Sequence, residues 1–580
     1  MIPQGAAARA PAGPAAAPAA PSRPHSLRRA DTFMLLGLFG TTLALRVAYA
    51  FSYPIDSDEP QHLHVAWAWT KGLLPYRDVF DNHAPLFQLV SAPLVAVIGE
   101  TPRILVLMRL AMTPFFAAAL VGSFVLGRRL FGARAGLWAA AVCGLSPTFF
   151  FKSLEYRADV LWAALWVAAI AVLLSGPLAA RRGFGAGLLL GSCLAVSLKT
   201  VMLLAALAFA SLSVLALMPR GGTKARRRIL PCALSLLGGT LLPPLAIVLF
   251  FASRGALRRL IECTLLHNLL PGVGRWGSSG RLYLLPPILA LLVLAARALV
   301  RRLPGDSARV AFLLLLSGSQ YALLSTVWPV HTRQDLLPFY PLFTPLVAGV
   351  LLARPDGAGT PGRSRFWTAR RAALLPGLLA CLELLLLPAL SPLAAHGASR
   401  QERLLREVLA LTGPDDYVLD LKGQAVFRNR PFYYALETMT LERMARGLIA
   451  DTIPERCIET RCSVAPADVA GFPPRARLFL RDHYVVVGTW RVAGLVVEPP
   501  APPDGPDPRF DILIPARYAV LTETGVRPGS IDGRPYDGPR DLVPGTHQMH
   551  PGPGTGRIAV LWAQAAERGF SPFAPAGAAP

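Results

Sequence analysis

The sequence predicts a polytopic α-helical membrane protein with a C-terminal extracytoplasmic region, in which an α/β domain is followed by a small β-sandwich-like module. Three observations support this class. Of the 580 residues, 53% are hydrophobic and only 16% are charged, which gives more apolar surface than one soluble core would bury. Apolar runs of membrane-spanning length recur as far as about residue 391. After about residue 396 these runs stop, and short strand-like pieces alternate with turns.

The charge pattern is typical of a membrane protein. A net charge of +23 in a soluble protein would suggest a nucleic-acid partner. Here, however, the arginines gather in short clusters between the apolar runs, as in Arg128–Arg129 and Arg301–Arg302. Such clusters are typical of cytoplasmic loops, so we expect membrane lipids and no nucleic acid as partners.

The chain begins with a segment rich in Ala and Pro, residues 1–30, which we expect to be a disordered cytoplasmic tail rather than a cleavable signal. The predicted transmembrane catalytic domain covers residues 31–395 and contains about eleven spans. These spans lie near residues 32–53, 103–127, 133–152, 158–178, 184–199, 200–218, 229–252, 282–300, 309–330, 337–353 and 372–391. With this number the basic clusters share one side, the N-terminus is cytoplasmic and the C-terminus is outside.

The C-terminal part is predicted to contain an extracytoplasmic α/β domain at 396–498, a Pro-rich linker at 499–508 and a β-sandwich-like module at 509–566, before a disordered tail at 567–580. Ile531–Arg534 followed by Leu542–His547 resembles the small β-sandwich modules called PEGA domains. Cys457 and Cys462 are close together in this outer region, where a disulfide and two free thiols are both open alternatives.

The first outer loop, residues 54–102, concentrates acidic residues directly after the first span. Asp56, Asp58 and Glu59 lie within four residues. Like charges so close are expected to raise at least one pKa, which suits a general base or a cation site. A solvated helix N-terminus is the alternative, because acids favour the positive end of the helix dipole and Pro60 suits a first turn.

Metal binding is a further interpretation of this loop. Glu59 and His62 have the spacing of a carboxylate and histidine ligand pair on a helix, but a di-iron bundle needs a second such motif, which is not visible. A single divalent cation held by Asp58, Glu59 and a histidine such as His83 remains open, as does the absence of any metal.

The order of motifs along the first loop is more specific than any of them alone. Asp58-Glu59 follows the first span, Gly72-Leu73-Leu74-Pro75-Tyr76-Arg77-Asp78 comes next, and Asp81-Asn82-His83-Ala84-Pro85-Leu86 precedes the second span. This order resembles the GT-C superfamily of membrane glycosyltransferases, in particular the branch with the protein O-mannosyltransferases and the lipid A aminoarabinose transferases. The resemblance covers about residues 32–350 and is strongest over 54–90.

The resemblance implies a role for each candidate residue. Asp58 would be the catalytic base that takes the proton of the acceptor hydroxyl, and Glu59 would orient it or bind the acceptor. Lys199 and Arg333 would stabilise the phosphate of the lipid donor, with His83 at a position where the aminoarabinose transferases have lysine. Asp159, at the start of a span, would bind acceptor or a cation together with His62. An Arg157–Asp159 ion pair is the structural alternative for Asp159, and snorkelling to lipid headgroups is the alternative for Lys199 and Arg333.

These observations predict a membrane glycosyltransferase of the bacterial cytoplasmic membrane, which transfers a sugar, with inversion, from a polyprenyl monophosphate to an acceptor hydroxyl at the outer face. The acceptor would be a lipid, a glycan or a protein, and no cofactor is certain beyond the divalent cation left open above. Two alternatives remain: a transferase that uses a diphosphate-linked glycan, and a transporter of polyprenyl-linked sugars. A transporter should show two related halves with broken spans, and no such repeat is visible.

Overall fold

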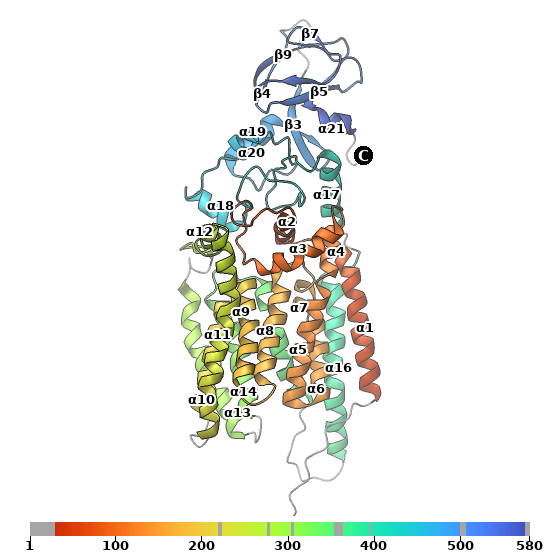
Figure 1. Cartoon of the computed structure of the whole chain (residues 1–580). Helices are drawn as coiled ribbons and strands as arrows, with labels where there is room; N and C mark the ends of the chain where they lie inside the picture. The colour runs from red at the N-terminus through yellow and green to blue at the C-terminus, as the bar shows by residue number, and fades with distance from the viewer. Residues whose placement is uncertain are drawn as a thin grey trace, which may run out of the picture.

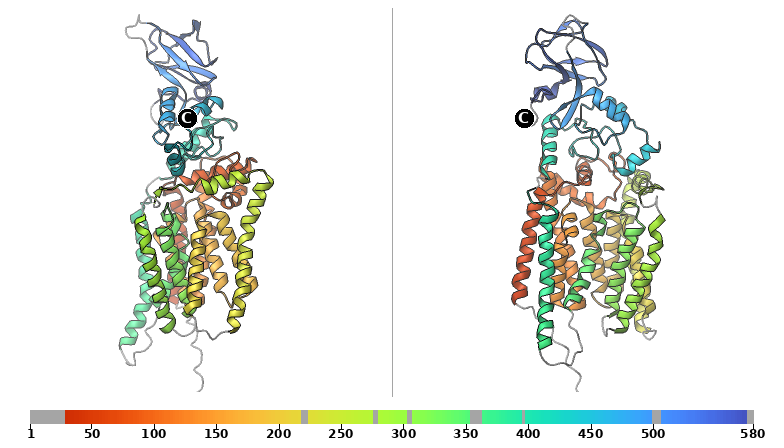
Figure 2. Two further views of the ribbon diagram at one scale, coloured as in Figure 1. Left: turned by 90° about the vertical axis from the view of Figure 1, so that its left-hand side faces the viewer. Right: turned by 180° about the vertical axis from the view of Figure 1, so that it is seen from behind.

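The structure, a computed structural model, describes residues 29–217, 223–274, 279–302, 307–352, 363–394, 397–498 and 506–574. The molecule is elongated, with a helical bundle at one end and the β-strands at the other (Figures 1 and 2). Of the predicted tails at 1–30 and 567–580, residues 1–28 and 575–580 lie outside the described residues, as do residues 499–505 of the predicted linker. Residues 567–574 are described, and the side chain of Phe570 is buried.

The bundle consists of apolar helices, most of them long, that run side by side (Figure 1). They are α1 (Arg29–Ser52), α4 (Ile104–Leu110), α5 (Thr113–Phe131), α6 (Ala133–Leu145), α7 (Pro147–Lys152), α8 (Ala158–Leu174), α9 (Ala180–Val196), α10 (Thr200–Leu217), α11 (Thr223–Ser253), α13 (Leu285–Arg302), α14 (Ser307–Thr326), α15 (Tyr340–Leu352) and α16 (Arg363–Leu390).

Six segments among the described residues are long and apolar enough to cross a membrane, and shorter apolar helices pack beside them. The six are Asp31–Ser52, Ile104–Phe131, Thr200–Leu217, Arg227–Ser253, Arg281–Arg301 and Ser307–Thr326. Many of their leucines are exposed, such as Leu241 and Leu249 on α11, as expected of side chains that face lipid. The predicted class of multi-pass helical membrane protein is therefore confirmed, and the number of eleven spans stays a prediction.

Small residues bring two of the spans close together. On α9, Gly183, Gly187 and Gly191 recur every four residues, so they share one face of the helix. A Cβ added at Gly187 would lie 2.2 Å from the carbonyl oxygen of Leu236 on α11. Only glycine permits this backbone approach of α9 to α11, and the segment that carries Lys199 follows α9 directly.

Two short helices of the first outer loop, α2 (Asp58–Thr70) and α3 (Leu86–Ile98), lie across the end of the bundle nearest the β-strands (Figure 1). The short helix α12 (Leu257–Ile261) and the π-helical turn that follows it (Glu262–Leu266) lie at the same end, as do the 3-10 turns at Ser279–Leu284 and Arg333–Leu336. The segments where chemistry was expected therefore gather at one end of the molecule.

The outer region contains five helices and ten strands among the described residues. The helices are α17 (Ser399–Leu411), α18 (Thr438–Ala445), α19 (Ile453–Glu459), α20 (Pro474–His483) and α21 (Ala563–Glu567). The strands are β1 (Val464–Pro466), β2 (Tyr484–Val487), β3 (Trp490–Val497), β4 (Arg509–Ile512), β5 (Ala516–Thr522), β6 (Gly529–Ile531), β7 (Arg534–Pro535), β8 (Arg540–Leu542), β9 (Gly545–Pro551) and β10 (Ile558–Trp562).

The strands form two antiparallel sheets. One has the order β1-β3-β10-β5-β8, with β2 also paired to β3, and the other has the order β4-β9-β6-β7. In the first sheet, Val560 of β10 lies between Leu495 of β3 and Val520 of β5. The predicted boundary at 499–508 thus falls between strands of one sheet, so the α/β domain and the β-sandwich-like module share a hydrogen-bonded core. Local patterning could not reveal this, because it says nothing about which strands pair.

Cys457 and Cys462 are both buried free thiols in this region. The backbone N–H of Cys462 donates to the carbonyl oxygen of Cys457 at 2.8 Å, which closes the end of α19.

Candidate active site

The predicted catalytic acids lie at the start of α2, with Asp58 and Glu59 in its first turn. The Asp58 N–H donates to Asp56 Oδ1 at 3.0 Å, and the Asp56 N–H donates to Glu59 Oε1 at 2.8 Å. Acids in a first turn favour the helix dipole, so the helix-terminus interpretation correctly describes the backbone. The two side chains nevertheless point to different surroundings and meet different partners.

Glu59 is fully buried and forms an ion pair with Arg109 of α4, which is also fully buried. Its Oε2 accepts from Arg109 Nε at 2.7 Å and from the backbone N–H of Tyr156 at 2.9 Å. Arg109 in turn donates to the carbonyl oxygens of Tyr53 and Pro54. Since these bonds occupy both carboxylate oxygens, Glu59 joins α2 to α4 and to the segment before α8, and it does not line the cavity described below.

Asp58 is held between two cations from distant parts of the chain. Arg157 Nη1 donates to its Oδ2 at 2.5 Å, and Lys422 Nζ from the outer region donates to its Oδ1 at 2.9 Å. Burial raises the pKa of Asp58, but the charges of Arg157 and Lys422 outweigh burial and hold this pKa well below its usual range. The expected rise in pKa from neighbouring acids is therefore wrong for Asp58, because cations rather than acids are its closest neighbours.

The ion pairs continue from Asp58 to Lys199. Arg157 Nε donates to Asp159 Oδ2 at 3.1 Å, so the local ion pair expected as the structural alternative for Asp159 is present. Lys199 Nζ lies 3.7 Å from Asp159 Oδ1 and donates to Asp335 in a short hydrogen bond. The predicted residues Asp58, Asp159 and Lys199 thus lie along one row of alternating charge.

His62 and His83 lie against each other, with ring centroids 4.4 Å apart. Asp81 Oδ1 lies 2.8 Å from His83 Nδ1, and Asp81 Oδ2 accepts from Gln88 Nε2 at 2.9 Å. Gln88 Nε2 also donates to His62 Nδ1 at 2.9 Å, which leaves the proton of a neutral His62 on Nε2. Burial, with the charges of His83 and Arg157, lowers the pKa of His62 well below its usual range, so His62 is neutral near pH 7.

These groups line one cavity of about 380 Å³ where the bundle meets the outer region. Its polar side carries Asp58, His62, His83, Asp159, Arg157, Lys199 and Lys422. Its apolar side carries Val196 at the end of α9 and Leu198 just after it, together with Trp328 and Val330, which follow α14. The cavity therefore offers charged groups beside an apolar wall made by the ends of membrane helices, which suits a ligand with a charged head and an apolar tail.

The structure does not bring every predicted residue to this cavity. Arg333 is exposed and is absent from the cavity wall, while its neighbours Thr332 and Gln334 line it. In the part of the chain that the structure describes, no three His, Cys, Asp or Glu side chains are grouped so as to hold a metal ion. Glu59 and His62 have the spacing of a ligand pair, but the oxygens of Glu59 bind Arg109 instead.

Sequence reasoning missed three cations that the structure places near Asp58 and Glu59, namely Arg157, Lys422 and Arg109. Arg157 was considered only as a local partner of Asp159. Lys422 is one of only five lysines in the chain, which is the one signal that could have marked it. Nothing in the sequence connects it to Asp58, which lies 364 residues earlier.

The fold and this cavity together define a multi-pass helical membrane protein, and its similarity to the solved structures below confirms the GT-C fold that the resemblance predicted. No family model and no curated protein matches the chain. Among solved structures, the chain is similar to ArnT from Cupriavidus metallidurans in the apo state, with a TM-score of 0.50 and 14% identity over 80% of this chain and 98% of that chain. The same ArnT bound to undecaprenyl phosphate gives a TM-score of 0.51 and 15% identity over the same shares.

Proposed function

We propose that this protein is a glycosyltransferase that transfers a sugar from a polyprenyl monophosphate carrier to an acceptor hydroxyl. The observation that carries the proposal is the single cavity in which Asp58 and the cations Arg157 and Lys199 meet an apolar wall formed by Leu198 and Trp328. A polyprenyl phosphate sugar has the matching parts, namely an apolar chain, an anionic phosphate and a polar sugar. The similarity in fold to an ArnT solved with undecaprenyl phosphate supports the same ligand class.

In the proposed reaction, the acceptor oxygen attacks C1 of the donor sugar, and the bond from C1 to the phosphate oxygen breaks. Asp58 takes the proton of the acceptor hydroxyl, and the electron pair of the broken bond leaves with polyprenyl phosphate. Direct displacement inverts the configuration at C1. The leaving group is a stable anion, so the main task of the site is to stabilise its charge with fixed cations.

Lys199 is the cation best placed for the phosphate, because it follows α9 and lies next to Leu198 on the apolar wall. Asp159 and Asp335 hold its ammonium group in position. Arg157 and Lys422 keep Asp58 ionised, which a base requires, although a carboxylate with two cationic partners is also a weak base. An acceptor hydroxyl that takes the place of Lys422 at Oδ1 would reach Asp58 and restore its basicity at the same time.

The site would work at the outer face of a bacterial cytoplasmic membrane. The basic clusters then lie in the cytoplasm, as the positive-inside rule requires, and the N-terminus is cytoplasmic. This topology places the outer region and the cavity on the extracytoplasmic side, where lipid-linked sugars would meet their acceptors.

The test uses the full chain in detergent with a panel of polyprenyl monophosphate sugars, and measures sugar release or transfer. Native protein should consume at least one donor, and Asp58→Asn should lower turnover at least about 100-fold, as expected for loss of a general base. Asp78→Asn is the matched control, because Asp78 is also paired with an arginine in the same loop but lies outside the cavity. Consumption of no donor, or equal turnover of Asp58→Asn and native protein, would contradict the proposal.

A further inference from the structure

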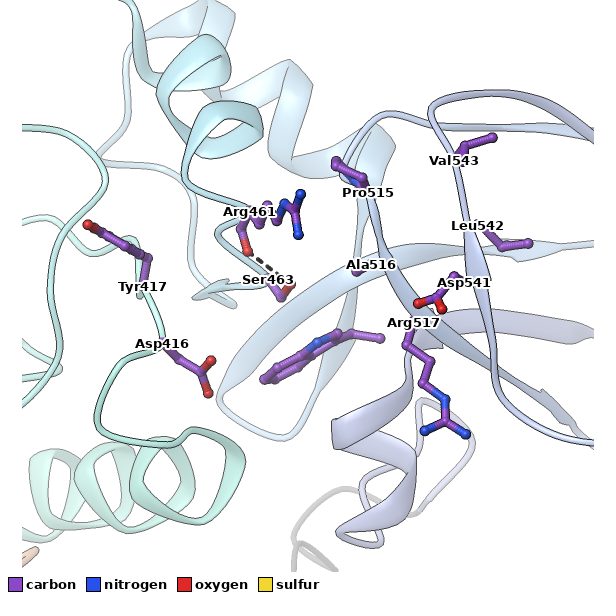
Figure 3. Close-up of a pocket in the computed structure, with 11 residues that line it drawn as sticks. Asp416, Tyr417, Arg461, Ser463, Pro515, Ala516, Arg517, Asp541, Leu542 and Val543 are labelled. Carbon is purple, nitrogen blue, oxygen red and sulfur yellow. Dashed lines mark hydrogen bonds between the residues drawn. The ribbon is translucent and has the colours of Figure 1, made fainter.

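A second cavity, of about 450 Å³, lies in the outer region and shares no lining residue with the first. One wall comes from the segment after α17 and the segment between α19 and β1, and the other from β5, β8 and the end of β10. In Figure 3, Asp416, Arg461 and Ser463 lie on the first wall and Asp541 lies on the second. The two walls belong to the parts of the chain on either side of residues 499–508.

Four charged side chains line this cavity, and they balance to a net charge of zero: Asp416 and Asp541 against Arg461 and Arg517. Arg517 and Asp541 are direct cross-strand partners in the β5–β8 pair. Even so, among the described residues the side chains of Arg461 and Asp541 form no hydrogen bond or ion pair, and Arg517 donates only to the carbonyl oxygen of Pro539. The charged groups are thus available to a ligand without giving the site an excess of either charge.

Other groups of the cavity are held in place. Asp416 Oδ2 accepts from the backbone N–H of Gly413 at 2.7 Å and from Gln564 Nε2 at 3.1 Å, so its carboxylate is oriented before any ligand binds. The backbone of Arg461 has a φ of 53°, an uncommon conformation for a residue with a side chain, and the backbone hydrogen bond from the Cys462 N–H to the Cys457 carbonyl oxygen maintains this turn. A fixed set of polar groups lowers the entropy cost of binding.

The cavity also presents an aromatic ring. Trp562 lines it and is 9% exposed, and its indole N–H donates no hydrogen bond within the described part of the chain. Pro515, Ala516 and Leu542 add apolar surface around it. An indole ring beside carboxylate, guanidinium and hydroxyl groups matches a sugar, since the C–H face of a sugar packs on an aromatic ring and its hydroxyls need both donors and acceptors.

We propose that this cavity is a binding site for a neutral saccharide, separate from the catalytic cavity. The balanced charge disfavours a phosphate or a cationic peptide, each of which would meet two like charges. The volume lies within the usual range for small-ligand sites and is large enough for one or two sugar units. The site does not depend on the proposed transferase activity, because binding needs neither Asp58 nor a lipid donor.

The experiment measures binding of neutral mono- and disaccharides of glucose, galactose, mannose and N-acetylglucosamine to the full chain in detergent, by saturation-transfer NMR and by tryptophan fluorescence. At least one sugar should bind with millimolar affinity. Asp541→Ala and Arg461→Ala should each weaken binding about tenfold, the effect of losing one hydrogen bond to a charged group. Both residues are exposed, so these variants should fold.

The matched controls are Asp482→Ala and Arg481→Ala, which remove an exposed acid and an exposed arginine of the same outer region away from the cavity. These controls and Asp58→Asn should bind the sugar as native protein does. The proposal is overturned when no sugar of the panel binds at 20 mM, roughly the weak limit of such sites. It is also overturned when binding survives both cavity variants, or when Asp58→Asn abolishes it, since the sugar then occupies the catalytic cavity.

Discussion

The ion pair between Glu59 and Arg109 allows a direct test of whether Glu59 acts in the chemistry or in the fold. Both side chains are fully buried, and Glu59 also accepts from the backbone N–H groups of Asp56 and Tyr156. Glu59→Gln keeps the shape but removes the counter-ion of a buried guanidinium. Breaking a buried pair in this way costs about 3–5 kcal/mol, so we expect the free energy of unfolding to fall by that amount.

The assay is unfolding in dodecyl maltoside micelles with rising SDS, followed by tryptophan fluorescence, together with turnover per folded protein. The double variant Glu59→Gln with Arg109→Met should lose less than the sum of the two single variants, because it leaves no unpaired charge. Glu402→Gln is the matched control. Its partners Arg103 and Arg406 are exposed, so it should cost less than about 1 kcal/mol. A Glu59→Gln protein of native stability with turnover reduced 100-fold would refute the structural role.

Two further predictions concern the cavity. Lys199→Met should weaken the binding of a polyprenyl monophosphate about tenfold, because one charge-assisted hydrogen bond is lost. Arg333→Ala lies outside the cavity and should leave the dissociation constant unchanged. Equal effects of the two variants would contradict the assignment of Lys199 to the phosphate. The second prediction concerns pH. Because the pKa of Asp58 is lowered, its carboxylate stays ionised and keeps its ion pairs even below the usual aspartate pKa. Both are lost only as the pH falls through the lowered value. The pH–rate profile should therefore show no acid limb from Asp58 above about pH 4. Lys422→Ala should move this limb to higher pH, and Lys71→Ala, at an exposed lysine that follows α2, should not.

Much of the fold could be predicted from the sequence because hydropathy reports directly on membrane burial. The short strands expected after about residue 396 are present, among them Tyr484–Val487 and Ile558–Trp562. What local patterns could not give was pairing between distant segments. The close approach of α9 to α11 explains the glycines of α9, but the sequence of α9 alone does not identify α11 as its neighbour. In the same way, the sequence does not show that β3 pairs with β10.

The candidate site shows the same limit in its electrostatics. Neighbouring acids in the sequence predicted a raised pKa, because residues close in the chain were the only charges whose distances were known. In the folded chain Glu59 is neutralised by Arg109 and Asp58 by Arg157, so the acids are separated by their own counter-ions. Asp58 and Lys199 both line the cavity, and both could be singled out in the sequence because a carboxylate after a first span and a lysine between apolar runs stand out locally. Arg333 stood out in the same way, and only the fold shows that it lies outside the cavity.

The position of Lys422 links the outer region to Asp58 of the candidate site. Its neighbour Gly423 has a φ of 80°, and an added Cβ would lie 2.8 Å from the Cβ of His64 on α2, so the backbone must approach α2 closely for Lys422 to reach Asp58. The contact between Val426 O and His64 Nδ1, 2.7 Å apart, holds the same loop on the same helix. Because the loop that carries Lys422 rests on the helix that carries Asp58, any movement of the outer region away from the membrane domain would remove one of the two cations from Asp58. Binding of an acceptor in the cavity and docking of the outer region are therefore expected to compete for the same carboxylate oxygen.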